Sequence, residues 1–122
     1  MCEALRKAWI VATMPSATYT LIRKAILAER QITCHCNGRY REVCPHILGH
    51  TDGEQKLLAF QFGGESSKPL PRRGEWRCLY IDRMSHVVTR DGPWHAGSSH
   101  RREQSCVAEV DLDINIHVRH LR

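Results

Sequence analysis

The sequence predicts a mainly β protein with one N-terminal helix and about five antiparallel strands in a small, partly closed barrel. Three observations predict this fold: one segment with helical periodicity, several segments in which apolar and polar residues alternate, and Asn-Gly or Asp-Gly pairs between them. Such a sheet has to bury one face and protect its edges, and partial closure achieves both. At 122 residues, with 42% hydrophobic and 25% charged residues, the chain has the composition of one globular domain.

The helix is expected over residues 16–29. Ser16 follows a proline and suits the N-cap, where its side-chain oxygen accepts a hydrogen bond from a backbone N–H of the first turn. Apolar residues then recur at helical spacing, namely Leu21, Ile22, Ala25, Ile26 and Ala28. Residues 1–15 are expected to form an arm or a short helix, so the barrel domain with its leading helix covers residues 16–122.

Two tight turns define the first three strands. Asn37-Gly38 and Asp52-Gly53 are residue pairs that adopt the positive φ angles of two-residue hairpin turns. In the first strand, Ile32, Cys34 and Cys36 are expected to share one face. Pro45 is expected to disturb the second strand locally. The three strands predicted around these turns cover residues 32–36, 39–51 and 54–62.

The second half of the chain contains a long loop and two further strands. Residues 63–74 are rich in Gly, Pro and Ser and predict a long loop, followed by a strand over residues 75–82. Residues 89–103 are mostly polar, which predicts irregular structure. Residues 110–118 alternate apolar and polar side chains and predict a long, half-buried strand. An exposed strand of this kind pairs readily with a second copy, so we expect a homodimer.

Charge and cysteine content narrow the class of protein. The net charge is +5, and most of the 18 basic residues are arginines, whose planar fork suits carboxylates and phosphates. No apolar run approaches the ~20 residues of a membrane span, and the N-terminus lacks the order of a secretory signal. We therefore expect a cytoplasmic protein that does not bind membranes. In that compartment all six cysteines are expected to be reduced thiols.

Cysteines and histidines cluster around the first hairpin and leave two interpretations open. Cys34 and Cys36 precede the turn, and Cys44 and His46 follow it, so these four residues form a candidate zinc site. The other interpretation is that the cysteines pack as small apolar side chains, because they continue the expected core face. A looser set, His95, His100 and Cys106, matches no established ligand spacing. No cofactor is therefore expected, with zinc as the alternative.

No catalytic signature is evident. Cys36 with His46, or Cys78 with His86, would supply a thiol and a base. Neither cysteine is expected at a helix N-terminus, where a thiolate is readily stabilised. The prediction is therefore a binding protein rather than an enzyme.

Arginines at several strand positions suggest a binding site for an anion. Arg41 lies on the second predicted strand, Arg77 on the fourth and Arg83 just after it. If the strands curl into a barrel, these residues are expected to meet on one rim with His46, Gln61 and Trp76. Guanidinium groups beside an aromatic ring suit the phosphate and base of a nucleotide or single strand. The alternative is that they are scattered charges.

The chain resembles the WYL domain family. The resemblance covers about residues 20–90 and rests on the order of segments 21–26, 32–46, 53–60 and 76–84. These include the motifs Arg41-Glu42-Val43-Cys44-Pro45-His46 and Arg77-Cys78-Leu79-Tyr80-Ile81-Asp82-Arg83. Lys56-Leu57-Leu58 stands in place of the naming tripeptide, and Cys36 in place of a tyrosine.

The WYL resemblance implies an Sm-like or SH3-like barrel in a bacterial ligand-sensing module. Family members are thought to bind nucleotides or single-stranded nucleic acid in a basic pocket, here Arg41, His46, Arg77 and Arg83. The family usually carries a DNA-binding domain. For this chain, the resemblance therefore implies a role in transcription regulation with a protein partner that supplies DNA binding.

Overall fold

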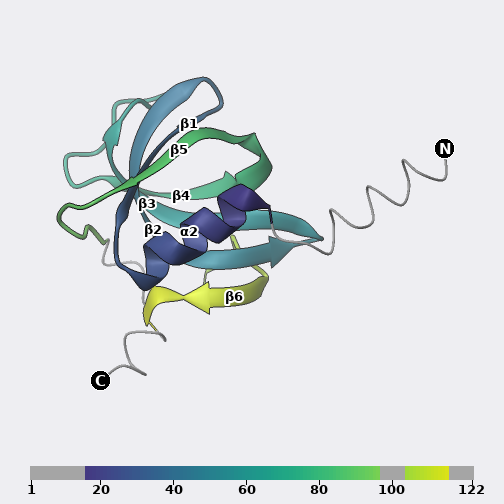
Figure 1. The fold of residues 1–122 in the computed structure, drawn as a ribbon. Helices are drawn as coiled ribbons and strands as arrows, with labels where there is room; N and C mark the ends of the chain where they lie inside the picture. Colours follow the sequence, from purple (N-terminus) through teal and green to yellow (C-terminus); the bar gives the residue numbers. More distant parts are fainter. Residues whose placement is uncertain (1–15, 97–103, 116–122) are drawn as a thin grey trace.

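The computed structural model describes residues 16–96 and 104–115. Within them the protein is mainly β, with one N-terminal helix and an antiparallel sheet of six strands, which confirms the predicted mainly β class with a leading helix (Figure 1). The elements are α2 (Ala17–Leu27), β1 (Gln31–Cys36), β2 (Arg39–Thr51), β3 (Glu54–Gly64), β4 (Glu75–Tyr80), the short 3-10 turn η1 (Ile81–Arg83), β5 (Met84–Arg90) and β6 (Glu109–Asp113). No helix among the described residues is long and apolar enough to cross a membrane.

Helix α2 begins where its cap predicts. The backbone N–H of Tyr19 donates to Ser16 Oγ at 3.1 Å, so Ser16 is the N-cap. The helix ends at Leu27, two residues before the predicted end, because Glu29 adopts a left-handed φ of 52°. Its apolar stripe faces the sheet, and Ile22 and Ile26 are fully buried there. Burial of that stripe holds the helix against β1, β2 and β5.

Both predicted hairpin turns are present. Asn37 and Gly38 have φ angles of 54° and 73°, and Asp52 and Gly53 have 53° and 79°. These left-handed conformations match the right-handed twist of the flanking strands. The turns fix the register of β1 against β2 and of β2 against β3.

Strand β2 organises the sheet. It pairs with β3 from Arg41 to Thr51, while its other edge pairs first with β1 and then with β6. Register shifts between Glu42 and Val43 and between Pro45 and Ile47 mark bulges, which bend a strand. The strand path runs β4-β3-β2-β1-β5. In the described residues β4 and β5 do not pair, so the sheet is open and closure into a barrel is not established.

The structure corrects two strand predictions. Strand β5, over Met84–Arg90, was not expected, because a bulge and a positive φ of 51° at His86 break its alternating pattern. Strand β6 ends at Asp113, five residues short of the predicted end, and residues 116–118 lie outside the described part of the chain. Residues 1–15, expected as an arm or short helix, also lie outside it.

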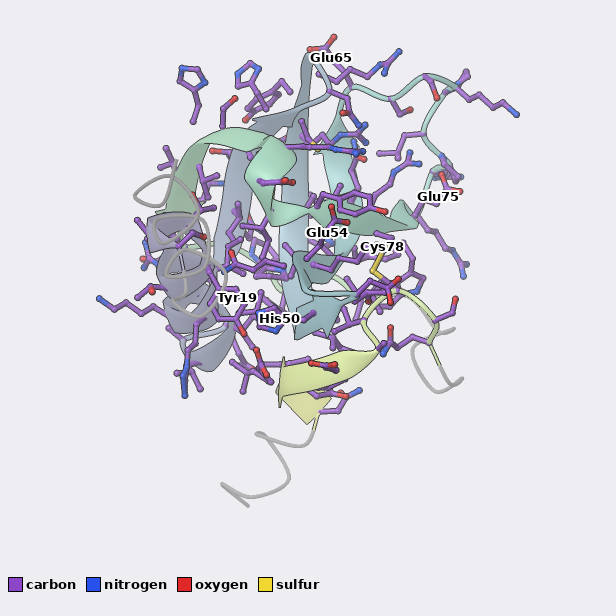
Figure 2. All side chains as sticks on the ribbon, turned by 90° about the vertical axis from the view of Figure 1, so that its right-hand side faces the viewer. Tyr19, His50, Glu54, Glu65, Glu75 and Cys78 are labelled. Atoms are coloured by element: carbon purple, nitrogen blue, oxygen red, sulfur yellow. A yellow bond between two sulfur atoms is a disulfide. The ribbon has the colours of Figure 1, made fainter. Side chains whose placement is uncertain are left out.

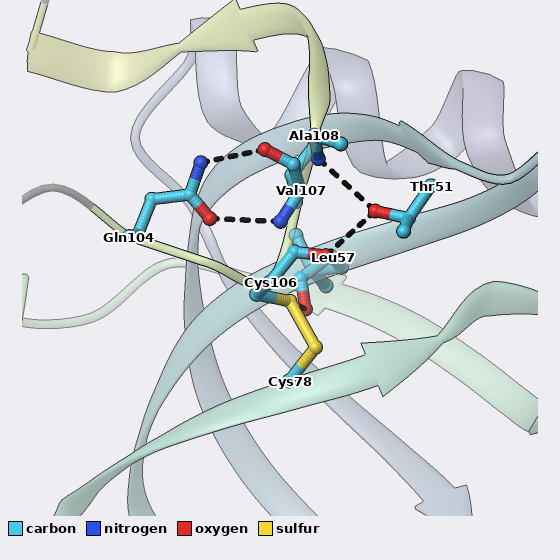
Figure 3. Close-up of a disulfide and its surroundings, with 7 residues drawn as sticks. All are labelled: Thr51, Leu57, Cys78, Gln104, Cys106, Val107 and Ala108. Carbon is cyan, nitrogen blue, oxygen red and sulfur yellow. Dashed lines mark hydrogen bonds between the residues drawn. A yellow bond between two sulfur atoms is a disulfide. The ribbon is translucent and has the colours of Figure 1, made fainter.

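Strand β6 is anchored near its middle, at its start and in the segment before it. Near its middle, the Tyr19 hydroxyl and His50 Nδ1 both contact Asp111 Oδ2, the latter at 3.1 Å, which links α2, β2 and β6 (Figure 2). Gly49 permits the close approach of β6, because a Cβ there would lie 1.9 Å from the carbonyl oxygen of Glu109. Before β6, the Thr51 hydroxyl donates to the carbonyl of Cys106 at 2.8 Å (Figure 3).

A disulfide joins Cys78 on β4 to Cys106, with the two Cα atoms 5.6 Å apart (Figure 3). The expectation that all six cysteines are reduced is therefore wrong for this pair. Sequence reasoning missed it because the two cysteines are 28 residues apart and only the fold brings them together. Cys34, Cys36 and Cys44 are free and buried.

We expect the disulfide to stabilise the fold by about 3 kcal/mol, because it closes a loop of 28 residues and restricts the unfolded chain. Chemical denaturation of the oxidised protein and of the Cys78→Ser/Cys106→Ser double variant measures this difference. Reductant should lower the stability of the natural chain to that of the variant and leave the variant unchanged. Equal stability of the oxidised and reduced chains would contradict the prediction.

Candidate functional site

A buried glutamine holds two arginines together on neighbouring strands. Gln61 on β3 is fully buried, and its Oε1 accepts from Arg41 Nη1 at 2.8 Å and from Arg77 Nε at 2.9 Å. Its Nε2 donates to the carbonyls of Gly63 and Glu65 at 3.0 and 2.9 Å. Both acceptor positions and both donor hydrogens of the amide are thus used. We call Arg41, Gln61 and Arg77 the arginine–glutamine cluster.

The strand register explains why these three side chains meet. Residues opposite each other on antiparallel strands share a face. Gln61 lies opposite the core residue Val43, and Arg77 lies opposite the core residue Ala59. Arg41 lies opposite Cys34, which is also in the core. The cluster therefore lies on the core side of the sheet, which explains the burial of its polar groups.

Arg41 carries a charge that the described residues do not neutralise. Its exposed fraction is 7%. Within the part of the chain that the structure describes, it forms no ion pair, and its Nε is buried without a hydrogen-bond partner. Its Nη1 donates to the neutral amide of Gln61, the one acceptor that the described residues give it. A buried charge without a counter-charge is costly, so this position favours an anion nearby.

Arg77 is partly neutralised and partly accessible. Its Nη2 lies 3.3 Å from Glu75 Oε2, and 24% of its side chain is exposed. Glu75 itself is about half exposed and lies at the start of β4 (Figure 2). Water weakens an ion pair of this kind. Within the described residues, the half-exposed Glu75 is the one carboxylate that pairs with a guanidinium group of the cluster, which leaves a local excess of positive charge.

Arg83 lies in η1, close to Cys36 at the end of β1. The adjacent residue, Met84, is the register partner of Cys36 on β5. Burial raises the pKa of Cys36, and the positive charges of Arg41 and Arg83 act in the opposite direction. Arg41 and Arg83 therefore both lie near enough to Cys36 to act on its charge.

The other two predicted residues lie on the opposite face of the sheet. Trp76 neighbours Arg77 in the strand and so points the other way. His46 is buried against it, with ring centroids 4.8 Å apart, and stacks on Trp94 at 4.9 Å. The Nδ1–H of His46 donates to the carbonyl of Cys44 at 3.0 Å. His46 and Trp76 thus form an aromatic contact separate from the arginine–glutamine cluster.

The four residues of the alternative zinc site are also divided between two faces. Cys34 and Cys36 lie in the main core, whereas the thiol of Cys44 accepts from the backbone N–H of His95 at 3.3 Å. His46 contacts the aromatic residues on the same side as Cys44. In the described ranges no group of three or more His, Cys, Asp or Glu residues gathers as metal ligands do. His100, from the looser set, lies outside those ranges.

Sequence reasoning did not single out Tyr80, the last residue of β4. The Lys56 ammonium lies 4.4 Å from its ring centroid, and the Arg83 guanidinium lies 4.3 Å from it. Lys56 is the register partner of Tyr80. Two features of the sequence could have pointed to Tyr80: the alternating pattern of β4, and the Asp-Arg pair in the turn that follows it. Tyr80 thus positions the side chain of Arg83 by a cation–π contact.

We expect Gln61→Leu to destabilise the protein by about 3 kcal/mol or more, because two guanidinium groups lose their acceptor and two carbonyls lose their donor. Gln55→Leu is the matched control on the same strand. Gln55 accepts a hydrogen bond from Ser16 at an exposed position, so its loss should cost less than about 1 kcal/mol. Urea denaturation measures both. Similar losses in the two variants would contradict a structural role for the buried amide.

No protein-family model, curated protein or solved structure matches this chain.

Proposed function

We propose that this protein is a regulatory binding module that recognises an anionic ligand, a nucleotide or single-stranded nucleic acid, through the arginine–glutamine cluster. The observation that carries the proposal is the environment of Arg41. Its guanidinium group is buried and donates a hydrogen bond to a neutral amide, whereas a carboxylate in that place would balance its charge. A phosphate supplies the missing negative charge, and its oxygens accept hydrogen bonds from the N–H groups of two neighbouring guanidinium groups.

The surroundings of the cluster favour a ligand that approaches from solvent. Arg77 is partly exposed and Arg83 is exposed, so both are accessible while Arg41 lies deeper. The net charge of +5 attracts anions over a longer range. We therefore assign Arg77 and Arg83 to first contact with the ligand and Arg41 to the innermost phosphate contact. His46 and Trp76 are assigned to the packing that holds β2 against β4.

The resemblance to WYL domains supports the same ligand class. That family is thought to bind nucleotides or single strands in a basic pocket of an Sm-like or SH3-like barrel. The strand order supports a barrel of this type here, since β4 and β5 follow each other in the chain but lie at opposite ends of the strand path. As a WYL-like module the protein would act through a partner that supplies DNA binding, and its proposed activity is binding without catalysis.

A cytoplasmic location is compatible with the disulfide if the bond responds to the redox state. Disulfides in the cytosol are usually transient, whereas those in oxidising compartments persist. The proposal of a cytoplasmic regulator therefore requires Cys78 and Cys106 to be reduced in part of the cellular pool. Thiol trapping in intact cells, followed by mass measurement, reports that fraction.

Binding is tested with a fluorescein-labelled hexanucleotide of thymidine and with AMP as competitor. We expect Arg77→Ala and Arg83→Ala each to weaken binding about tenfold, because each removes a charged hydrogen-bond donor. The affinity should also fall as salt rises. Fluorescence anisotropy measures both effects, and competition by AMP separates a nucleotide pocket from a groove for a longer strand.

Arg23→Ala is the matched control for these variants. Arg23 is exposed on α2, and its loss changes the net charge by the same amount as the loss of Arg77. It should therefore change the affinity by less than about twofold at moderate salt. A salt-independent affinity, or wild-type binding in both the Arg77 and Arg83 variants, would exclude the proposed site.

The absence of thiol catalysis is tested separately by alkylation. Burial raises the pKa of Cys36, the free cysteine considered as a nucleophile, and raises the pKa of Cys34 and of Cys44 to about 11, so all three remain protonated at neutral pH. We expect all three to react with iodoacetamide far more slowly in the native protein than after denaturation, and mass spectrometry identifies the labelled sites. Rapid native labelling of one of them would point to an activated nucleophile.

A further inference from the structure

Two exposed histidines lie side by side on β1 and β5, on the face of the sheet away from the main core. His35 stands between the buried residues Cys34 and Cys36 and so points to the opposite side. The ring centroids of His35 and His86 are 5.3 Å apart, with the ring planes at 70°. We propose that His35 and His86 form a binding site for a divalent late first-row transition-metal ion, separate from the arginine–glutamine cluster.

The backbone of β5 is distorted by a bulge at His86, next to His35 on β1. Thr33 pairs with Val88 and His35 pairs with Ser85, so β5 contains one extra residue between these pairs. His86 lies in this bulge and adopts a left-handed φ of 51°, which is uncommon outside glycine. Bulges redirect side chains, and strained residues gather at functional sites. The Thr33–Val88 register, continued without the bulge, would set His86 directly opposite His35, and the bulge instead leaves His86 beside the His35–Ser85 pair.

The spacing of the rings suits a shared metal ion. A zinc–nitrogen bond is about 2.1 Å long, so a ligating imidazole places its ring centre roughly 3 Å from the ion. Two such rings at a tetrahedral angle have centres about 5 Å apart, close to the observed 5.3 Å. Both side chains are exposed, and the terminal torsion of histidine rotates easily. Chelation thus requires rotation of the rings and no movement of the backbone.

Neighbouring side chains orient the two rings for this role. His86 Nδ1 lies 3.3 Å from the Ser85 hydroxyl. In the tautomer that donates its Nδ1–H to this hydroxyl, the Nε2 lone pair is left for a metal. The ring of Tyr40 lies 5.7 Å from that of His35 and limits its movement on the side of β2. A third His, Cys, Asp or Glu ligand is not grouped with the pair in the described residues, so water completes the coordination. Imidazole ligands favour copper, nickel and zinc over magnesium or calcium.

The test uses the whole chain and Ni²⁺, which broadens the NMR signals of nearby nuclei and does not oxidise thiols. In a titration of ¹⁵N-labelled protein, substoichiometric Ni²⁺ should first broaden the amides of residues 34–36 and 85–87. Zn²⁺ should displace it, and Mg²⁺ should not. His35→Gln and His86→Gln should each raise the Ni²⁺ concentration required by about tenfold or more.

His95→Gln is the matched control, because it removes an imidazole that stacks on Phe62 and lies outside the pair. It should leave the broadening at residues 34–36 and 85–87 unchanged. Both test positions are exposed, and an unchanged amide spectrum verifies that the variants fold. Broadening that begins elsewhere in the chain, or wild-type sensitivity in both single variants, would overturn the proposal. Equal displacement by Mg²⁺ would also overturn it.

Discussion

The fold depends on the pairing of β2 with three other strands. β2 runs from Arg39 to Thr51, pairs with β3 along one edge and shares its other edge between β1 and β6. Two bulges allow this long strand to bend, so its two halves contribute to different parts of the sheet. The arginine–glutamine cluster follows from this arrangement, because it brings β3 beside Arg41 and β4 beside β3, and the same strand brings β6 against Gly49. The helix packs on the sheet that β2 organises and does not set the strand order.

The arginine–glutamine cluster shows how one buried amide can hold two like charges. Gln61 gives both guanidinium groups an acceptor and secures the turn after β3 with its two donor hydrogens. A glutamate there would have neutralised one of the charges, whereas the neutral amide leaves the excess in place. The two guanidinium groups are thus held in fixed positions while their positive charge is not balanced, and this suits the binding of an anion from solvent. It also explains why Arg41 remains buried without an ion pair in the described residues.

The cysteines that the structure describes have two structural roles: three are buried as free thiols, and two form a disulfide. Cys34 and Cys36 fill the core beneath α2, and Cys44 is held by the segment that follows β5. Cys78 and Cys106 connect β4 to the segment before β6, where Thr51 and Gln104 also fix the backbone. The disulfide, the Asp111 contacts and the close approach at Gly49 together hold a short strand that pairs, among the described residues, with β2 from Ile47 to His50.

The sequence by itself determined the elements that local chemistry controls. Ser16 predicts the start of α2, and the Asn37-Gly38 and Asp52-Gly53 pairs predict both hairpins, because capping and positive φ depend on a few adjacent residues. It also identified Arg41, Gln61 and Arg77, but their contact depends on the register of three strands. Only the tertiary structure separated His46 and Trp76 from that cluster, joined Cys78 to Cys106 and revealed β5. Bulges shift the alternation of side chains between faces, and the pairing of distant strands decides which residues meet.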